Sequence, residues 1–360
     1  MSQMPLAGSG STEAAQRITR VQRDAERRNT LIILGLVVVT FIAAMVELSV
    51  GASDIDLFTS MRALFGTGTP QDVASVQSIR LPRVVCAIIS GAGLALAGAA
   101  LQSVLENPLA SASTVGISQG AAFGATLAIL VVIPLLTGTS STLGMGATAL
   151  FAFAGAMVSS VIVLAFSRLG LMRPESIILV GVALSALWAG ASTIIQYFSN
   201  DVELTKVMFW QFGDLGRATW KQMGFMAAVA LGCGAYFFAN RWNYNALHNG
   251  GHVAEGLGVD VKRTRVMGVA VASLAAAAMV AFVGLINFIG LIAPHIARRL
   301  VGEDYRFLLP ASFVLGSAIM LLSDLAARMV ISPIILPIGA ITSFLGAPLF
   351  LYLLYRGYRR

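Results

Sequence analysis

Long apolar stretches recur along this chain, from Leu31 to Leu354, and they limit the folds that it can adopt. A hydrocarbon core of about 30 Å requires roughly 20 apolar residues for each helical crossing. With 57% hydrophobic and 11% charged residues, the chain is too apolar for an ordinary soluble domain. Barrel strands would show short alternating patterns, which are absent, so the crossings are predicted to be helices. The chain is therefore expected to be an all-α, polytopic membrane protein.

The apolar pattern predicts about ten membrane-spanning helices. The seventh and eighth come from one apolar tract, 266–297, in which Gly284, Gly290 and Pro294 favour a break over a single long helix. The predicted spans are 31–50, 83–105, 115–136, 146–166, 175–198, 220–240, 265–283, 285–299, 308–330 and 336–355. Residues 30–360 are accordingly expected to form one ten-helix transmembrane domain.

The distribution of basic residues predicts the orientation of these spans. Residues 1–29 are polar, carry five arginines between Arg17 and Arg28, and lack an Ala-x-Ala cleavage pattern, so they are interpreted as a cytoplasmic tail and not as a signal peptide. From that start, 17 of the 24 Lys and Arg residues fall on the cytoplasmic side and 7 outside. Both termini are thus expected in the cytoplasm, with the protein in the cell inner (plasma) membrane. A nine-span alternative would place the C-terminal arginines outside.

The net charge of +7 does not by itself indicate a nucleic-acid partner. The basic residues are scattered through short loops and form no stripe interleaved with aromatic residues, as a nucleic-acid surface would require. The asymmetry between the two sides of the membrane accounts for them better. We therefore expect contact with membrane lipid and no nucleic-acid partner.

The sequence offers little for a metal ion. Cys86 and Cys233 lie in different predicted spans, so neither is expected to form a disulfide or a zinc site. His248 and His252 have the spacing of helical metal ligands, but the two glycines between them make a preformed helical pair improbable. No metal site is expected.

Three segments between spans are longer than turns: 51–82 and 199–219 on the predicted outer side, and 241–264 on the predicted cytoplasmic side. The last is expected to form two short helices broken by glycines, which suits contact with a cytoplasmic partner.

Three sequence blocks resemble the FecCD-type permeases, the membrane subunits of ATP-binding cassette (ABC) importers for iron chelates, haem and cobalamin. The blocks keep the family's order. They are RLPRVVCAIISGAGLALAGAALQSVLENPLASASTVGISQGAAFGA at 80–125, FVGLINFIGLIAPHIARRLVGEDYRFLLP at 282–310, and SDLAARMV with LPIGAITSFLGAPLFLYLL within 323–354. The chain departs from the family in its long polar N-terminal tail and at Asp214, where many relatives have Ser.

The resemblance implies a cobalamin-permease-like fold and a homodimer that works with two cytoplasmic ATPase subunits and an extracytoplasmic substrate-binding protein. It also implies uptake by alternating access, with an iron chelate (siderophore or haem) as the first candidate cargo and a corrinoid as the second. The chain contains no Gly-x-x-x-x-Gly-Lys-Ser/Thr phosphate loop. It is therefore expected to be a transport subunit and not an enzyme, without a cofactor of its own, while ATP and Mg²⁺ bind to the partner ATPase.

On the predicted outer face, the resemblance assigns Arg80, Arg83 and Arg328 to docking of the binding protein. The alternative for the first two is that they reach the lipid headgroups, as any arginine at the end of a span can. The alternative for Arg328 is an ion pair with Asp324, one helical turn earlier.

On the predicted cytoplasmic face, the resemblance implies a gate and a contact with the ATPase. The gate residues are Asn107, Pro108 and Leu109, together with Arg173 and Pro174, although Asn-Pro is also an ordinary end of a helix. The ATPase contact is placed at 255–258, within a loop of about 241–264, and a plain solvated loop is the alternative. The four predicted coupling residues are Glu255, Gly256, Leu257 and Gly258.

Two other classes of function are less consistent with the sequence. An ion-coupled secondary transporter usually keeps carboxylates within its spans. Only Glu47 and Asp324 qualify, and both lie toward predicted outer ends. An intramembrane enzyme would need a catalytic set at depth, such as Ser-His or paired Asp, and none is visible.

Overall fold

The computed structural model describes residues 9–51, 56–137, 141–168, 174–332 and 334–358, and every regular element among them is a helix. Within these described ranges, eight helical segments are long and apolar enough to cross a membrane. They are built on α1 (Ser9–Ser49), α4 (Leu81–Val104), α5 (Ile117–Leu127), α7 (Ser141–Arg168), α8 (Pro174–Tyr197), α10 (Trp220–Ala239), α13 (Val261–Val283) and α15 (Tyr305–Met329). The predicted all-α membrane fold is confirmed.

Two further apolar helices correspond to the eighth and tenth predicted spans, and the first of them is shorter than predicted. α16 (Ile338–Tyr358) lies where the tenth span is expected, whereas α14 (Ile289–Val301) has only 13 residues. A helix of that length rises about 20 Å, less than the thickness of the hydrocarbon core. The chain leaves α13 at Gly284 (φ +81°), and residues 284–288 are not helical. The predicted break at Gly284 is therefore confirmed, but the prediction of a helix over all of 285–299 is wrong.

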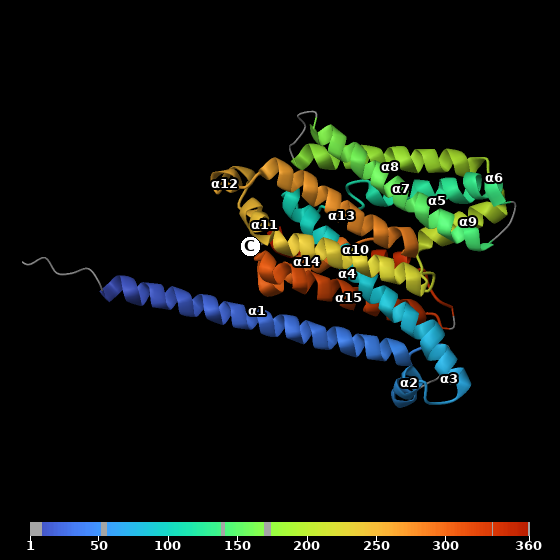
Figure 1. Cartoon of the computed structure of the whole chain (residues 1–360), viewed down its shortest axis with the longest axis horizontal. Helices are drawn as coiled ribbons and strands as arrows, with labels where there is room; N and C mark the ends of the chain where they lie inside the picture. Colours follow the sequence, from blue (N-terminus) through green and yellow to red (C-terminus); the bar gives the residue numbers. More distant parts are fainter. Residues whose placement is uncertain (1–8, 52–55, 138–140, 169–173, 333, 359–360) are drawn as a thin grey trace, which may run out of the picture.

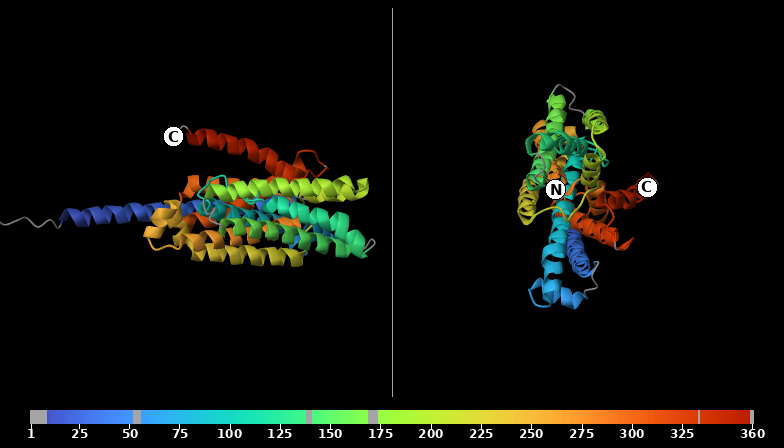
Figure 2. Two further views of the ribbon diagram at one scale, coloured as in Figure 1. Left: turned by 90° about the horizontal axis from the view of Figure 1, so that it is seen from above. Right: turned by 90° about the vertical axis from the view of Figure 1, so that its right-hand side faces the viewer.

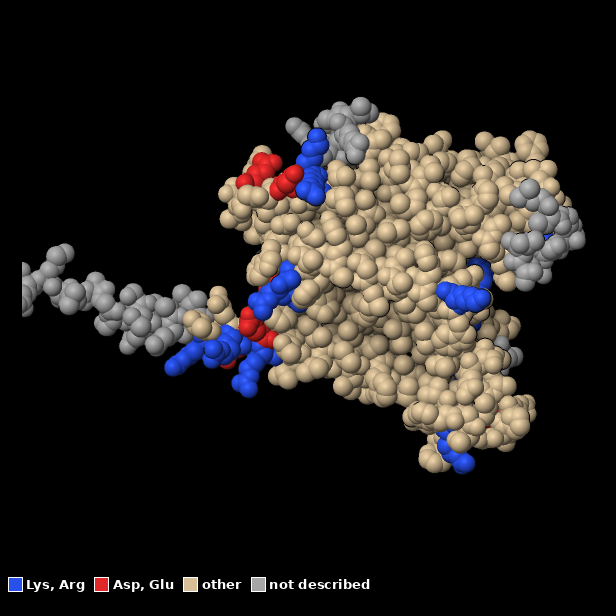
Figure 3. Space-filling model, in the orientation of Figure 1, with Lys and Arg blue, Asp and Glu red and all other residues tan. Residues whose placement is uncertain are grey.

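The long helices run roughly side by side, so that the short elements gather at the two ends of the bundle (Figure 1). One end holds α2 (Leu57–Leu64) and α3 (Pro70–Ser75), and we call it the α2 end. The other holds α11 (Arg241–His248) and α12 (Gly251–Gly256), and we call it the α12 end. Charged side chains lie mainly at these ends, with a broad uncharged belt between them (Figure 3). This belt is what a membrane-spanning bundle requires.

Helix α4 forms the centre of the bundle and packs against α15, α13, α14, α10 and α1. Its middle is rich in small residues, which allow helix backbones to approach closely in a membrane. A Cβ built on Gly98 would lie 1.6 Å from the carbonyl oxygen of Gly290 in α14, and one on Gly91 would lie 2.3 Å from that of Gly316 in α15. These contacts fix α4 against both neighbours.

Helix α1 runs through residue 30, the predicted boundary between the polar tail and the first span. No Gly or Pro interrupts the chain from 11 to 34, so the helix of the span can continue into the polar segment. Two contacts hold this part of α1, one to the last residue of α14 and one to the start of α15. Asn29 Nδ2 donates to the carbonyl oxygen of Val301 at 2.7 Å, and Glu26 pairs with Arg306 at 3.1 Å. From Ser9 onward, therefore, the polar segment is helical.

Candidate functional site

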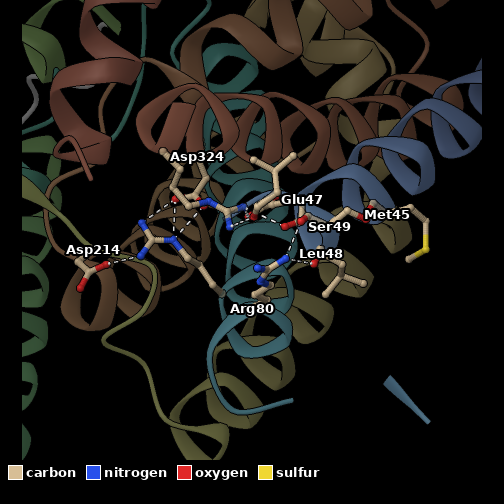
Figure 4. Close-up of polar contacts among 10 residues, drawn as sticks. Met45, Glu47, Leu48, Ser49, Arg80, Asp214 and Asp324 are labelled. Carbon is tan, nitrogen blue, oxygen red and sulfur yellow. Dashed lines mark hydrogen bonds and ion pairs between the residues drawn. The ribbon is translucent and has the colours of Figure 1, made fainter. Parts of the chain in front are cut away.

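A buried network of charged side chains joins α1, α4 and α15 at the α2 end (Figure 4). Asp324 is central to it: Nε and Nη2 of Arg83 donate to its carboxylate at 2.8–2.9 Å, and Nε of Arg328 lies 3.0 Å from Asp324 Oδ2. Arg328 also pairs with Glu47 of α1 at 3.0 Å. Arg83 reaches outward to Asp214, at 3.3 Å, in the segment that precedes α10. Each buried charge thus has an opposite charge beside it, as burial demands.

The arginines of this network also satisfy the carbonyl groups at the end of α1. Arg80 donates to the carbonyl oxygens of Leu48 and Ser49 at 2.9 and 2.6 Å (Figure 4), and Arg328 donates to that of Val50 at 3.0 Å. The last carbonyls of a helix lack intrahelical donors and carry partial negative charge, so a cation there is favourable. The network therefore closes the C-terminal end of α1 onto α4 and α15.

This burial changes the interpretation of the three predicted docking residues. Arg80, Arg83 and Arg328 were expected to present positive charge to a binding protein, but their side chains are buried and bonded within the chain. In this conformation the guanidinium groups are bonded to carboxylates and carbonyl groups of α1 and α15, so their charges are not freely presented at the surface. The alternative of an Arg328–Asp324 ion pair is confirmed. Docking itself stays a prediction.

At the α12 end, the predicted gate residues form a tight turn after α4. Glu106 has a positive φ (+44°) and forms an ion pair with Arg265. The side-chain oxygen of Asn107 accepts a hydrogen bond from the backbone N–H of Leu109 at 2.8 Å, a local turn typical of asparagine. Leu109 is exposed at the tip.

Asn107 and Pro108 also line a cavity of about 490 Å³, together with residues of α11 and α14. The structure thus places these two predicted gate residues beside the segment expected to contact the ATPase. Of the other two gate predictions, Arg173 lies outside the described residues, and Pro174 is the first residue of α8.

The predicted coupling loop forms two short helices, α11 and α12, with Asn249 and Gly250 between them. Gly250 and Gly258 have positive φ angles (+99° and +83°), which only glycine adopts without strain. Glu255 and Leu257 are exposed at the end of α12, with Gly256 between them. The predicted pair of helices is confirmed, and its exposed face remains available to a partner.

Side chains of α11 hold this helix to the bundle through contacts that no sequence motif indicated. Asn245 donates to Asp304 at 3.0 Å and accepts from the backbone N–H of Tyr305 at 2.8 Å. Tyr244 stacks on Tyr305, and His248 pairs with Glu303. His248 is thus an ion-pair partner, and the described residues contain no group of His, Cys, Asp and Glu that could hold a metal ion. In the sequence, the acidic pair Glu303-Asp304 after α14 is the one feature that could have indicated these contacts with α11.

The sequence profile of the FecCD transport family matches residues 30–356. The chain belongs to this family. A Methanocaldococcus jannaschii protein named as an ABC transporter permease is 45% identical over 330 residues, which cover 90% of this chain and 94% of that protein. A ferric-citrate import permease of Bacillus subtilis is 36% identical over 91% of this chain and 96% of its own length. Other relatives are named as permeases for haem and for cobalamin.

The fold comparison agrees with the sequence comparison. A solved structure described as a metal-chelate type ABC transporter in an inward-facing conformation has a TM-score of 0.76 and 31% identity, covering 91% of this chain and 99% of its own. This FecCD protein is therefore a multi-pass permease subunit of an ABC importer. It is not an enzyme, and a separate ATPase hydrolyses the ATP.

Proposed function

We propose that this FecCD permease imports an iron chelate, a siderophore complex or haem, by alternating access. The observation that carries the proposal is the match over nine-tenths of the chain to a metal-chelate transporter and to a ferric-citrate permease. In this proposal the ATPases bind at the α12 end in the cytoplasm, where both termini lie, and the binding protein docks at the α2 end outside. ATP and Mg²⁺ bind to the ATPases, and this chain needs no cofactor. A corrinoid is the second candidate cargo, because a relative is named for cobalamin.

An ion-coupled mechanism is not supported by the two carboxylates within the spans. Glu47 and Asp324 are buried, and each forms an ion pair with Arg328. A transported proton or cation would need a carboxylate that exchanges partners during the cycle. Here both groups are structural partners of arginines.

The proposed homodimer follows from apolar surface on one side of the bundle. Figure 2 shows that α16 diverges from the bundle on the same side as α8. Phe344 and Leu351 of α16 are exposed, as are Leu179 and Ile194 of α8. A second copy on this side would cover these residues and leave a pathway between the two subunits. The proposal is consistent with the low polarity of both helices.

The function can be tested with proteoliposomes that contain this chain, its ATPase and its binding protein. We expect ATP-dependent uptake of a radioiron siderophore or of haem, and uptake that requires all three components. Uptake of cobalamin alone would replace the iron chelate by the second candidate. Uptake by this chain alone, driven by an ion gradient, would overturn the proposal.

Leu257→Asp is expected to lower uptake at least about tenfold, because an apolar side chain buried at a partner surface contributes roughly 1.5–3 kcal/mol. Leu257 is 69% exposed at the tip of α12. The measurement compares uptake and ATP hydrolysis in the same proteoliposomes. Val21→Asp is the matched control, because Val21 is also 69% exposed but lies on α1. Equal losses in the two variants would contradict a specific contact at α12.

Phe344→Glu is expected to weaken the dimer at least about tenfold, because a charge at an apolar interface loses solvation without gaining a partner. Phe344 is 78% exposed on α16. Native mass spectrometry across a concentration series measures the ratio of dimer to monomer. Leu231→Glu is the control, since Leu231 is 63% exposed on α10, on the other side of the bundle. If both variants dissociate alike, the α8–α16 side is not the interface.

A further inference from the structure

A cavity of about 450 Å³ at the α2 end has no role in the proposed function. Its walls come from α7, α9 (Asp201–Phe212), α10, α13 and the π-helical turn Ala128–Val132 with α6 (Ile133–Thr137), which continue α5. The lining includes the apolar side chains of Ile129, Phe209 and Phe282. It also includes the polar side chains of Arg217, Lys206 and Gln222. The cavity thus combines an apolar surface with two cations, and its lining contains no carboxylate among the described residues.

The ends of four candidate membrane-spanning segments indicate the level of the cavity in the membrane. The candidate spans that contribute to its walls end at Leu135 and at Val283, and begin at Gly144 and at Trp220. Four independent boundaries therefore place the cavity at the level where the hydrocarbon core gives way to the headgroups. Helix α10, which forms one wall, lies on the side of the bundle away from α16 (Figure 2), so this wall is not part of the proposed dimer contact.

Arg217 is a partly buried cation of this site. Its Nη2 donates to the carbonyl oxygen of Phe209 at 3.0 Å, whereas its Nη1 is buried without a hydrogen-bond partner among the described residues. Burial lowers the pKa of the Arg217 guanidinium, and the charge of Asp214 opposes that change. Asp214 is itself engaged by Arg83 at 3.3 Å and by the backbone N–H of Gly216 at 3.0 Å. An anion in the cavity would supply the partner that Nη1 lacks.

Further positive charge surrounds the site. Lys206 is exposed, and no ion pair joins it to a carboxylate of the described chain. Figure 3 shows Lys and Arg side chains near the beginning of α10, without Asp or Glu beside them on that face. The two cations therefore face no carboxylate among the described residues that line the cavity.

We propose that this cavity binds an anionic phospholipid, with the phosphate beside Arg217 and Lys206 and an acyl chain along Ile129, Phe209 and Phe282. Guanidinium and ammonium groups complement phosphate oxygens, and Arg forms the stronger, paired hydrogen bonds. A small free anion would satisfy the cations but would leave the apolar wall uncovered. A lipid at the headgroup level satisfies both halves of the site.

The test is native mass spectrometry of the purified full chain, titrated with phosphatidylglycerol and with phosphatidylcholine. We expect the Arg217→Gln, Lys206→Gln double variant to bind phosphatidylglycerol at least about tenfold more weakly, because charge-assisted hydrogen bonds are lost. Arg62→Gln is the matched control. This variant removes one exposed cation at the α2 end that lies outside the cavity. The affinity of the Arg62→Gln chain for phosphatidylglycerol is therefore expected to be unchanged.

A second variant blocks the apolar part and keeps both cations. A Cβ on Gly144 would meet only the Ile133 side chain, at 3.6 and 3.8 Å, so Gly144→Leu is expected to fold and to fill part of the cavity. It should also reduce phosphatidylglycerol binding, and millimolar inorganic phosphate should not compete. Unchanged affinity in both variants would overturn the proposal. Full competition by inorganic phosphate would show a free-anion site and overturn the lipid assignment.

Discussion

Asp324→Ala is expected to lower the free energy of unfolding by about 3–5 kcal/mol, the cost of leaving buried charges without their partner. The Asp324 carboxylate is fully buried and holds both Arg83 and Arg328. Its loss leaves two guanidinium groups in a low-dielectric interior, where only Glu47 and the half-exposed Asp214 remain to balance them. Unfolding of the detergent-solubilised chain, followed by circular dichroism against denaturant, measures this change.

Asp214→Asn is the control for this prediction, because it removes another carboxylate partner of Arg83. The Asp214 side chain is 46% exposed and forms a single ion pair at 3.3 Å. Exposed pairs of this kind contribute about 0–1 kcal/mol. A loss below about 1 kcal/mol is therefore expected. If the two variants were equally destabilised, burial of the network would not be what makes Asp324 important.

The same network shows where prediction from the sequence reached its limit. An arginine at the end of a span is equally consistent with lipid headgroups, a docking protein or a buried ion pair. Arg83 pairs with Asp324, a carboxylate 241 residues away in the sequence. Only the packing of α4 against α15 brings the two side chains together. The Arg328–Asp324 pair, by contrast, lies within one helical turn and was open to prediction.

The helices themselves were predictable because apolar length determines them. The break after α13 was also visible, since Gly284 adopts a positive φ that other residues rarely accept. The late start of α14 was not visible, because Phe288 (φ +66°) takes a left-handed conformation that its residue type disfavours.

The coupling and gate regions show the same division. Glycines at 250 and 258 indicated the ends of short helices, and Asn107 indicated a turn, because these signals are local. The anchoring of α11 through Asp304 and Tyr305 depends on contacts between segments about 60 residues apart. The cavity lined by Lys206 and Arg217 likewise depends on the packing of several helices, which no local pattern indicates. Local features of the sequence thus predicted local structure, whereas contacts between distant segments could not be predicted from it.

Gly98→Ala is expected to destabilise the chain by about 3 kcal/mol, at the upper end of the cost of overpacking a well-packed core. The added Cβ would lie 1.6 Å from the carbonyl oxygen of Gly290 and 2.7 Å from its Cα. Backbone atoms cannot turn aside as a side chain can, so α4 and α14 would have to separate. The denaturant titration used for Asp324→Ala measures the loss, and a reduced yield of folded protein should accompany it.

Two further glycines turn this prediction into a graded series. A Cβ on Gly93 would meet Sδ of Met279 at 2.8 Å, but that flexible side chain can move, so Gly93→Ala should cost about 1 kcal/mol. Gly232 of α10 has nothing within 4 Å of its added Cβ, and alanine there should stabilise the helix by about 0.5–1 kcal/mol. The free energy of unfolding is expected to fall in the order Gly232→Ala, Gly93→Ala, Gly98→Ala. A different order would mean that the close approach of α4 and α14 does not constrain this fold. If the expected order is found, the distance between these two helices is set by the absence of a single methyl group.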